Sequence, residues 1–446
     1  MPNILSLLEC FVPYVSSATI RQLGQIIPAM LMMSGRVTML GMSRWTEKGG
    51  SYRNIQRFFY TVIPWTKLFW VFFQQYLLKS DDVYLLVGDE SVVTKAGKKT
   101  HGMDRFFSSL YGKAIPGLAF FVLSLLNTKE RKSYPMSIKQ RVRSEAEKAE
   151  AKRKKAKKKK AKGKVGRPKG SKNKDKSEIV LTEELSFIQS MIHQFLSLVK
   201  GVLPLTYLVL DGHFGNKNAL HMTVQCGLHL ISKLRHDAAL YFLYDGDYQG
   251  SGRPRKYGEK VDYHNLPEQY LKQTTLIDHI QTRIYQATLL NKQFPQALNV
   301  VIILKTNLQT GKSSHVILFS SDLTLTYELL IDYYSLRFQI EFNFRDAKQY
   351  WGLEDFMNVT ETAVHNAANL SLFMVNLSQV LLTDFRKHSP QAGILDLKTH
   401  FRGYKYVSET LKLLPKMPDP ILIQRIFQSI SQLGSIHHSH SRFNSS

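Results

Sequence analysis

The architecture of this chain can be inferred from one segment, Tyr334-Ser-Leu-Arg337-Phe-Gln-Ile-Glu341-Phe-Asn-Phe-Arg-Asp-Ala-Lys348. Tyr334, Arg337, Glu341 and Lys348 are separated by three, four and seven positions. At about 100° per residue they lie within roughly 60° of one helix face, and Arg345 extends this stripe. One carboxylate held among cations suits a metal ligand beside a phosphate backbone, although an amphipathic helix with mixed surface charges explains the pattern equally well.

A second stripe on the same segment is apolar and lies about 100° further round the helix. It consists of Tyr333, Leu336, Ile340, Phe344, Ala347 and Trp351. We therefore predict one helix over 325–352 that buries this stripe against a core.

Two short apolar runs, residues 83–87 and 207–210, lead to Asp89 and Asp211. Each run predicts a buried strand that ends on an acid. Side chains at strand C-termini in α/β sheets project into the crevice where ligands bind, so we expect both acids to meet Glu341 there. Taken singly, each Asp is better explained as a strand-end residue that caps a turn, and the three acids together with the cationic stripe are harder to explain as packing.

Three carboxylates gathered in a low-dielectric site repel one another unless divalent cations lie between them. Two Mg²⁺ ions about 3.5–4 Å apart can activate a water or a 3′-hydroxyl and stabilise the leaving oxygen in phosphoryl transfer. We predict Asp89, Asp211 and Glu341 as catalytic residues and as ligands of two Mg²⁺ ions, for which Mn²⁺ can substitute.

The composition is that of a basic, folded protein. The chain has 446 residues, 43% of them hydrophobic, which is enough for two or three domains. Its 60 Lys and Arg against 35 Asp and Glu leave a net charge of +25, which indicates a polyanionic partner, either nucleic acid or an anionic membrane surface.

The remaining composition predicts a cytoplasmic protein. Its two cysteines, Cys10 and Cys226, support no disulfide framework. The N-terminus has no basic region before its apolar residues, as a secretory signal would. No apolar run is long enough to span a bilayer, so we expect a soluble protein and no membrane partner.

The positive charge is concentrated in residues 152–176, which hold fifteen Lys and Arg and one Asp, a net +14. Within this segment Arg167-Pro-Lys169 resembles the core of an AT-hook, which lies extended in the minor groove of A·T-rich DNA. A second such core is Arg253-Pro-Arg255. We predict DNA contacts at these four cations, with a solubilising loop as the alternative.

Residues 1–80 have apolar residues at helical spacing, interrupted at Gly49-Gly50. Arg53 and Arg57 lie one turn apart on one predicted helix, whose apolar residues face away from them. This arrangement favours a small DNA-binding unit of the helix-turn-helix type, and a bundle with an incidental basic face is the alternative.

The spacing Tyr334-x2-Arg337-x3-Glu341-x6-Lys348 resembles the YREK motif of bacterial insertion-sequence DDE transposases of the IS-four type. The surroundings of Asp89 and Asp211 resemble the first and second acidic blocks of that family, and the resemblance extends over residues 20–385. It implies an α/β, RNase H-like catalytic core with a strand-rich insertion between the second and third acids.

The same resemblance implies Mg²⁺-dependent cleavage at transposon ends and transfer of the 3′-OH into target DNA. Tyr334, Arg337, Lys348 and Arg345 would hold phosphates of double-stranded DNA, both terminal inverted repeats and target. A homodimer or larger oligomer on paired ends, at the bacterial nucleoid, is implied as well. Residues 212–330 contain no tryptophan on which a flipped base could stack, as it does in family members.

The predicted organisation has five regions. They are a helical DNA-binding domain at 1–80, a first part of the RNase H-like core at 81–233 with a basic insert at 144–176, a polar insertion at 234–298, a second part of the core with the catalytic helix at 299–390, and a C-terminal helical region with a tail at 391–446. Two other functions stay open: a DNA-binding regulator without catalysis, derived from a transposase, and an RNase H-like nuclease.

Overall fold

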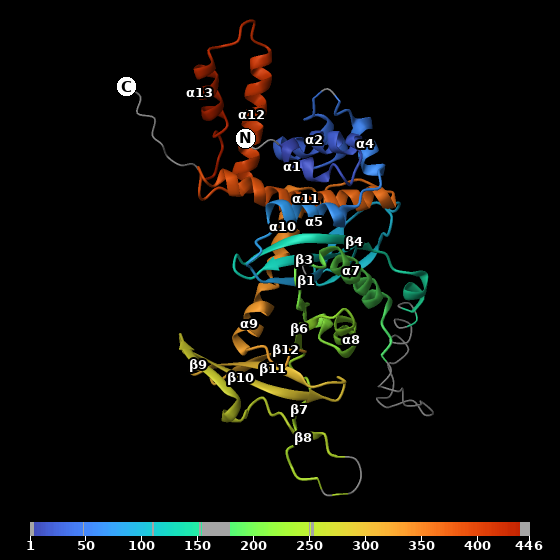
Figure 1. Cartoon of the computed structure of the whole chain (residues 1–446), viewed down its shortest axis with the longest axis vertical. Coiled ribbons are helices and arrows are strands. Elements are labelled where there is room, and N and C mark those ends of the chain that lie inside the picture. The colour runs from blue at the N-terminus through green and yellow to red at the C-terminus, as the bar shows by residue number, and fades with distance from the viewer. Residues whose placement is uncertain are drawn as a thin grey trace.

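The computed structural model describes residues 4–47, 49–108, 111–150, 153, 179–248, 250 and 254–437. Within these residues twelve strands form one mixed sheet (Figure 1). The strands are β1 (Tyr84–Thr94), β2 (Asp104–Ser108), β3 (Lys113–Asn127), β4 (Lys132–Arg141), β5 (Tyr207–Val209), β6 (His229–Leu234), β7 (Leu240–Leu243), β8 (Tyr257–Lys260), β9 (Leu271–Ile277), β10 (Ile280–Asn291), β11 (Leu298–Asn307) and β12 (Ser313–Ser320).

Helices surround the sheet and connect its strands. They are α1 (Ile4–Leu8), α2 (Ser17–Met32), α3 (Met39–Ser43), α4 (Tyr52–Tyr60), α5 (Trp65–Tyr76), α7 (Glu183–Val199), α8 (Lys217–Gln225), α9 (Tyr327–Leu336), α10 (Gln339–Tyr350), α11 (Glu361–Phe385), α12 (Ile394–Lys412) and α13 (Pro420–Ile430), with short 3₁₀ turns η1 (Glu9–Phe11), η2 (Gly212–Phe214) and η3 (Glu268–Tyr270). In the described part of the chain, no helix is long and apolar enough to cross a membrane.

Five strands, in the order β4-β3-β1-β5-β6, form the half of the sheet that carries the predicted acids. The pairings β4–β3 and β3–β1 are antiparallel, whereas β1–β5 and β5–β6 are parallel. Parallel neighbours need a crossover connection, and α8 provides it between β5 and β6. Helices α5, α10 and α11 pack against β4.

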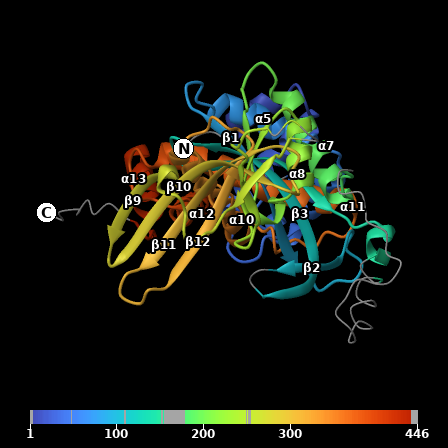
Figure 2. The same ribbon diagram turned by 90° about the horizontal axis from the view of Figure 1, so that it is seen from below.

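The other half of the sheet continues from β6 through β12, β11, β10, β7 and β8, with β9 paired to β10. Strand β12 joins the halves by pairing antiparallel with β6. Seen from below, β9–β12 extend to one side of the molecule and β2 and β3 to the other (Figure 2). In the chain, β7–β12 lie between Asp211 and Glu341. Apart from the short turn η3, they form a strand-rich extension of the sheet.

The N-terminal helices share one continuous hydrophobic core with the sheet. Figure 1 shows α11 lying between the helices α1, α2 and α4 and the strands. The Trp65 indole Nε1 donates to Asn366 Oδ1 at 2.7 Å, and the Asn366 amide donates to the carbonyl oxygens of Phe59 and Thr61. Burial of these polar groups is tolerated because each finds a partner.

Much of the predicted secondary structure is confirmed. The described residues of 1–80 are helical, and the strands that lead to Asp89 and Asp211 are present. The apolar stripe of the Tyr334–Lys348 segment is buried throughout. DNA binding by residues 1–80 stays a prediction.

Two predicted elements are wrong in detail. The helix expected over 325–352 is two helices, α9 and α10, separated at Arg337 and Phe338, where hydrogen bonding tightens to the i→i−3 pattern. No Gly or Pro lies at this break, so the sequence carries no signal for it. Strand β1 also does not end at Asp89, because its pairing with β3 continues to Thr94.

Candidate active site

Asp89 is positioned by the pairing of β1 with its two neighbours. Strand β1 pairs with β3 along its whole length, but its parallel pairing with β5 ends at Val87, opposite Val209. Glycine at the preceding position 88 lets two side chains pack close to the strand, since a Cβ there would lie 2.8 Å from the Phe121 ring and 2.9 Å from the end of Leu210. Asp89 therefore lies where β1 loses its parallel neighbour, with only 17% of its side chain exposed.

Asp211 follows β5 at the equivalent place on the neighbouring strand. Continuing the parallel register by two residues puts Asp211 beside Asp89. Its carboxylate Oδ1 accepts from the His213 amide at 3.1 Å and so caps η2. Its carbonyl oxygen accepts from Ser232 Oγ at 2.7 Å, which ties this turn to β6.

Glu341 lies in the first turn of α10, which is fixed on the sheet at several points. The Asn343 amide donates to Ser133 Oγ on β4 at 2.8 Å. At the other end of the helix, Lys348 Nζ donates to the Val92 carbonyl on β1 at 3.0 Å. Burial of Ile340 and Phe344 completes the contact. Helix α10 thereby holds Glu341 alongside β1.

The direct partner of Asp89 is Arg337, at the break between α9 and α10. Arg337 Nη1 donates to Asp89 Oδ2 at 2.8 Å, and both side chains are largely buried. Burial raises the pKa of Asp89 to about 7, an effect that Arg337 opposes and that the charges of Glu341 and Asp211 increase. Asp211 and Glu341 therefore both lie within electrostatic reach of Asp89.

The other residues of the charged stripe lie at the same site or next to it. Burial raises the pKa of the Tyr334 phenol; Arg337 opposes this, and the nearby Asp211 and Asp89 charges add to it. Lys348 forms an ion pair with Glu354 at 3.5 Å. Arg345 is more exposed, and its guanidinium pairs with Asp346 and covers the Phe342 ring.

The donor set of this site fits a hard divalent cation. All three acids offer only carboxylate oxygens, which Mg²⁺ prefers, and a bound cation would favour the charged form of Asp89, whose pKa is raised chiefly by burial. Within the described residues, however, no group of three or more His, Cys, Asp or Glu is close enough to form a ready ligand set. Asp211 and Glu341 lie near enough to Asp89 to act on its charge, and Arg337 is the direct counter-charge of Asp89.

The remaining predicted DNA contacts lie elsewhere. Arg53 and Arg57 are exposed on α4. Arg255 is engaged within the protein, because its Nε donates to the Tyr257 carbonyl and its guanidinium lies 5.0 Å from the Tyr244 ring centroid. Arg167, Lys169 and Arg253 lie outside the described residues.

Two features of α10 were missed by sequence reasoning. Phe338 and Phe342 lie on its accessible face, 56% and 36% exposed, with ring centroids 5.6 Å apart. Two aromatic residues four positions apart, on the polar helix face that carries Glu341, could have indicated this exposed aromatic surface from the sequence. The buried anchor Asn343 had none, since its partner Ser133 lies 210 positions away.

The comparison with protein families covers the part of the chain that carries two of the three acids. The family model described as DDE superfamily endonuclease matches residues 10–291. The match includes Asp89 and Asp211 and ends at the last residue of β10, before Glu341. No curated protein matches the sequence.

Proposed function

Because the chain belongs to the DDE superfamily of endonucleases, we propose that it is a DDE transposase of the YREK type. It cleaves DNA at transposon ends and joins the freed 3′-OH to target DNA. The observation that supports the proposal is that Asp211 and Glu341, from two other elements, lie within electrostatic reach of Asp89. Nothing in core packing requires acids from β1, the β5–η2 turn and α10 to approach one another.

The topology supports an RNase H-like core for this enzyme. Strands β4-β3-β1 form an antiparallel meander, and β5 and β6 continue it in parallel with helical crossovers. Strands β7–β10 lie within the stretch 234–298 predicted as the insertion, and β11 and β12, which follow in the stretch predicted as core, pair onto the same strands. Fold likeness alone does not identify a reaction, so the proposal depends on the acids.

Asp89, Asp211 and Glu341 would hold two Mg²⁺ ions, or Mn²⁺ in their place, which when bound would activate the attacking oxygen and stabilise the leaving one. The protein's own contribution is to place the DNA strand. Arg337, at the break before α10, offers a planar fork that suits a phosphate, and Lys348, in the last turn of α10, offers a point charge eleven residues further along the chain. Tyr334 lies beside both acids of the sheet.

The partner would be double-stranded DNA, comprising terminal inverted repeats and target, bound by a homodimer or larger assembly. The net charge of +25 supports a polyanionic partner. Exposed Arg53 and Arg57 on α4, and the Arg345–Phe342 pair beside Glu341, supply accessible cations and an aromatic surface for it.

The test is strand cleavage and joining on the element's own terminal repeats with Mg²⁺. Asp89→Asn, Asp211→Asn and Glu341→Gln should each lower the rate by about 10³-fold or more, because each removes a charge on which several kcal/mol of transition-state stabilisation depend. DNA affinity measured in EDTA should change little.

Matched controls are Asp245→Asn and Glu328→Gln, which alter exposed acids remote from the site. Both should retain wild-type activity. Full Mg²⁺-dependent activity in all three site variants would overturn the catalytic assignment.

A second candidate function is a DNA-binding regulator without catalysis. It is favoured by one observation: within the described residues, Asp89 is bonded to Arg337 and the acids do not form a ready ligand set. Metal-independent binding of the terminal repeats, without nicking of any end sequence, would select this candidate over the transposase.

A further inference from the structure

The end of β6 brings a lysine into line with two of the acids. The parallel register of β1, β5 and β6, continued by two residues beyond its last pairs, sets Asp89, Asp211 and Lys233 side by side. The Leu210 amide, which donates to the Ile231 carbonyl at 3.1 Å, supports this continuation. Neighbouring strands lie about 4.8 Å apart, so the Lys233 backbone is about 5 Å from that of Asp211 and about 10 Å from that of Asp89.

Lys233 faces the same side of the sheet as the acids. Side chains alternate along a strand, so residues in one row across the strands share a face. The preceding row shows this, since a Cβ on Gly88 would lie 2.9 Å from the end of Leu210, its neighbour in that row. The row of the acids continues from Lys233 to Leu318 on β12, which is buried, whereas Lys233 is exposed. Lys233 is therefore an accessible cation one strand away from Asp211.

The turn after Asp211 is shaped around this lysine. A Cβ on Gly212 would lie 3.3 Å from Lys233 Cε, and a Cβ on Gly215 would overlap the Lys233 carbonyl oxygen. Ser232 Oγ ties the same turn to β6 by donating to the Asp211 carbonyl at 2.7 Å. The Lys233 side chain therefore lies against the turn, and its ammonium, one bond beyond Cε, lies next to Gly212.

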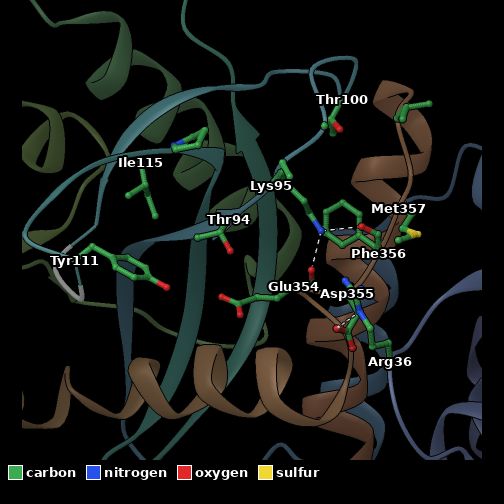
Figure 3. Close-up of a pocket in the computed structure, with 14 residues that line it drawn as sticks. Arg36, Thr94, Lys95, Thr100, Tyr111, Ile115, Glu354, Asp355, Phe356 and Met357 are labelled. Atoms are coloured by element: carbon green, nitrogen blue, oxygen red, sulfur yellow. Dashed lines mark hydrogen bonds and ion pairs between the residues drawn. The ribbon is translucent and has the colours of Figure 1, made fainter.

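Lys233 differs from the other cations near the site in its lack of a partner. Arg337 pairs with an acid of the site, and Lys348 donates to a carbonyl oxygen of β1. Lys95, in the wall of a pocket at the end of β1, donates to two carbonyl oxygens of the loop after α10 (Figure 3). In the part of the chain that the structure describes, no acceptor pairs with the Lys233 ammonium. It is thus available to an anion that comes from outside.

The row of acids has a cation at each end. Arg337 meets Asp89 at one end, and Lys233 lies beyond Asp211 at the other. A DNA strand carries one negative charge per nucleotide, so a strand laid across this row gains from a cation beside the phosphate that is held at the acids. A lysine ammonium is a compact point charge with three donors, which suits a phosphate in any orientation.

We propose that Lys233 binds a phosphate of the DNA strand at the candidate active site, adjacent to the phosphate that is cleaved and on the side of Asp211. The inference rests on the proposed function for the identity of the strand. The contact is between a charged side chain and a phosphate, so it contributes to affinity whether or not a metal ion is bound.

The experiment maps this contact with DNA whose phosphates are neutralised one at a time. Fluorescein-labelled duplexes of the terminal repeat carry a single methylphosphonate, moved step by step along the strand, and their affinity for the full chain is measured by anisotropy in EDTA. At the contacted position the methylphosphonate should weaken wild-type binding about two- to fivefold, the range for an exposed charge pair. In Lys233→Met the same methylphosphonate should have little further effect, because the partner charge is already gone.

Salt dependence gives a second readout of the same contact. Lys233→Met should lower the slope of log affinity against log salt by about 0.9, the value for one phosphate contact. Lys233→Arg should restore both the slope and the sensitivity to the methylphosphonate, because it keeps the charge.

The matched control is Lys416→Met, which alters an exposed lysine between α12 and α13. Figure 1 shows this helical hairpin beyond α11, away from β6, so the variant should keep the wild-type slope and map. A Lys233→Met variant with the wild-type map at every position would overturn the proposal. Cleavage is not needed for either readout, so a protein that shows the contact but does not cut DNA would refute the proposed function alone.

Discussion

Arg337 governs the electrostatics of the candidate active site from the break between α9 and α10. It neutralises Asp89 across 248 positions of sequence. Its Nε is buried and has no hydrogen-bond partner among the described residues. Because this N–H donor is unused, the guanidinium can donate a hydrogen bond to a phosphate oxygen while it keeps its bond to the carboxylate.

A second buried cation, Lys398 on α12, controls the stability of the fold rather than its chemistry. Its Nζ donates to the Met30 carbonyl at 2.6 Å and lies 4.8 Å from the Trp351 ring centroid. Burial, with the Arg402 charge adding to it, lowers the pKa of Lys398 from 10.5 to about 7. Between these values the unfolded chain binds more protons, so stability should rise with pH across this window, by up to about 1.4 kcal/mol per unit.

Lys398→Met should therefore raise the free energy of unfolding near neutral pH and flatten its rise toward alkaline pH, because the variant buries no titrating amine. Urea titrations at several pH values measure this. The control is Lys412→Met, an exposed lysine of the same helix, which should keep the wild-type pH slope. A loss of stability near neutral pH in Lys398→Met would show that its bonds to the carbonyls outweigh the cost of burial.

Among elements, the end of α10 matters most, because it fixes the loop that leads to Asp355. Gly352 has φ +79°, and a Cβ there would lie 2.4 Å from Val37 Cβ. The chain can therefore turn against Val37 only with glycine at this position. The turn leads directly to Asp355 and its bond to the Val37 amide.

Gly352→Ala should lower the free energy of unfolding by about 2 kcal/mol or more, since left-handed strain costs about 1–2 kcal/mol and the clash adds to it. Gly311→Ala is the control, with φ +66° and nothing within 4 Å of the added Cβ. Its free energy of unfolding should fall only by the cost of the backbone strain. Chemical denaturation compares them. Equal losses of unfolding free energy in both variants would mean that Val37 moves aside without an energetic cost.

The same elements show what the sequence could predict. Helical periodicity identified the buried stripe from Tyr333 to Trp351 correctly, because each member faces one core. It missed the break at Arg337, which has no local marker. It misplaced the end of β1, because the change from apolar to polar residues at Asp89 marks the loss of a parallel neighbour rather than the end of the strand.

At the scale of the whole molecule, charge distribution is the property that sequence alone predicts best. The segment 152–176 lies almost wholly outside the described residues, and its net +14 follows from the sequence. What the sequence could not predict is how the loop after α10 packs against the end of β1. This packing depends on contacts such as that of Lys95 Nζ with the Glu354 carbonyl oxygen, 259 positions apart.

Deleting residues 150–176 should weaken DNA binding and lower its salt dependence while the fold persists. Each lost phosphate contact should reduce the slope of log affinity against log salt by about 0.9. Affinities over a range of salt concentrations measure the slope. A variant of equal length with Ser in place of the lysines separates charge from length, and an unchanged slope in both would mean that the segment does not contact DNA.

The bond between Trp65 and Asn366 spans 301 positions, and this has a consequence for biosynthesis. At about 5–20 residues per second, a ribosome needs roughly 15–60 s to reach Asn366 after Trp65 has been made. During that interval the aromatic faces of α4 and α5 have no α11 to cover them. Until α11 is made, the nascent chain therefore exposes apolar surface that favours aggregation.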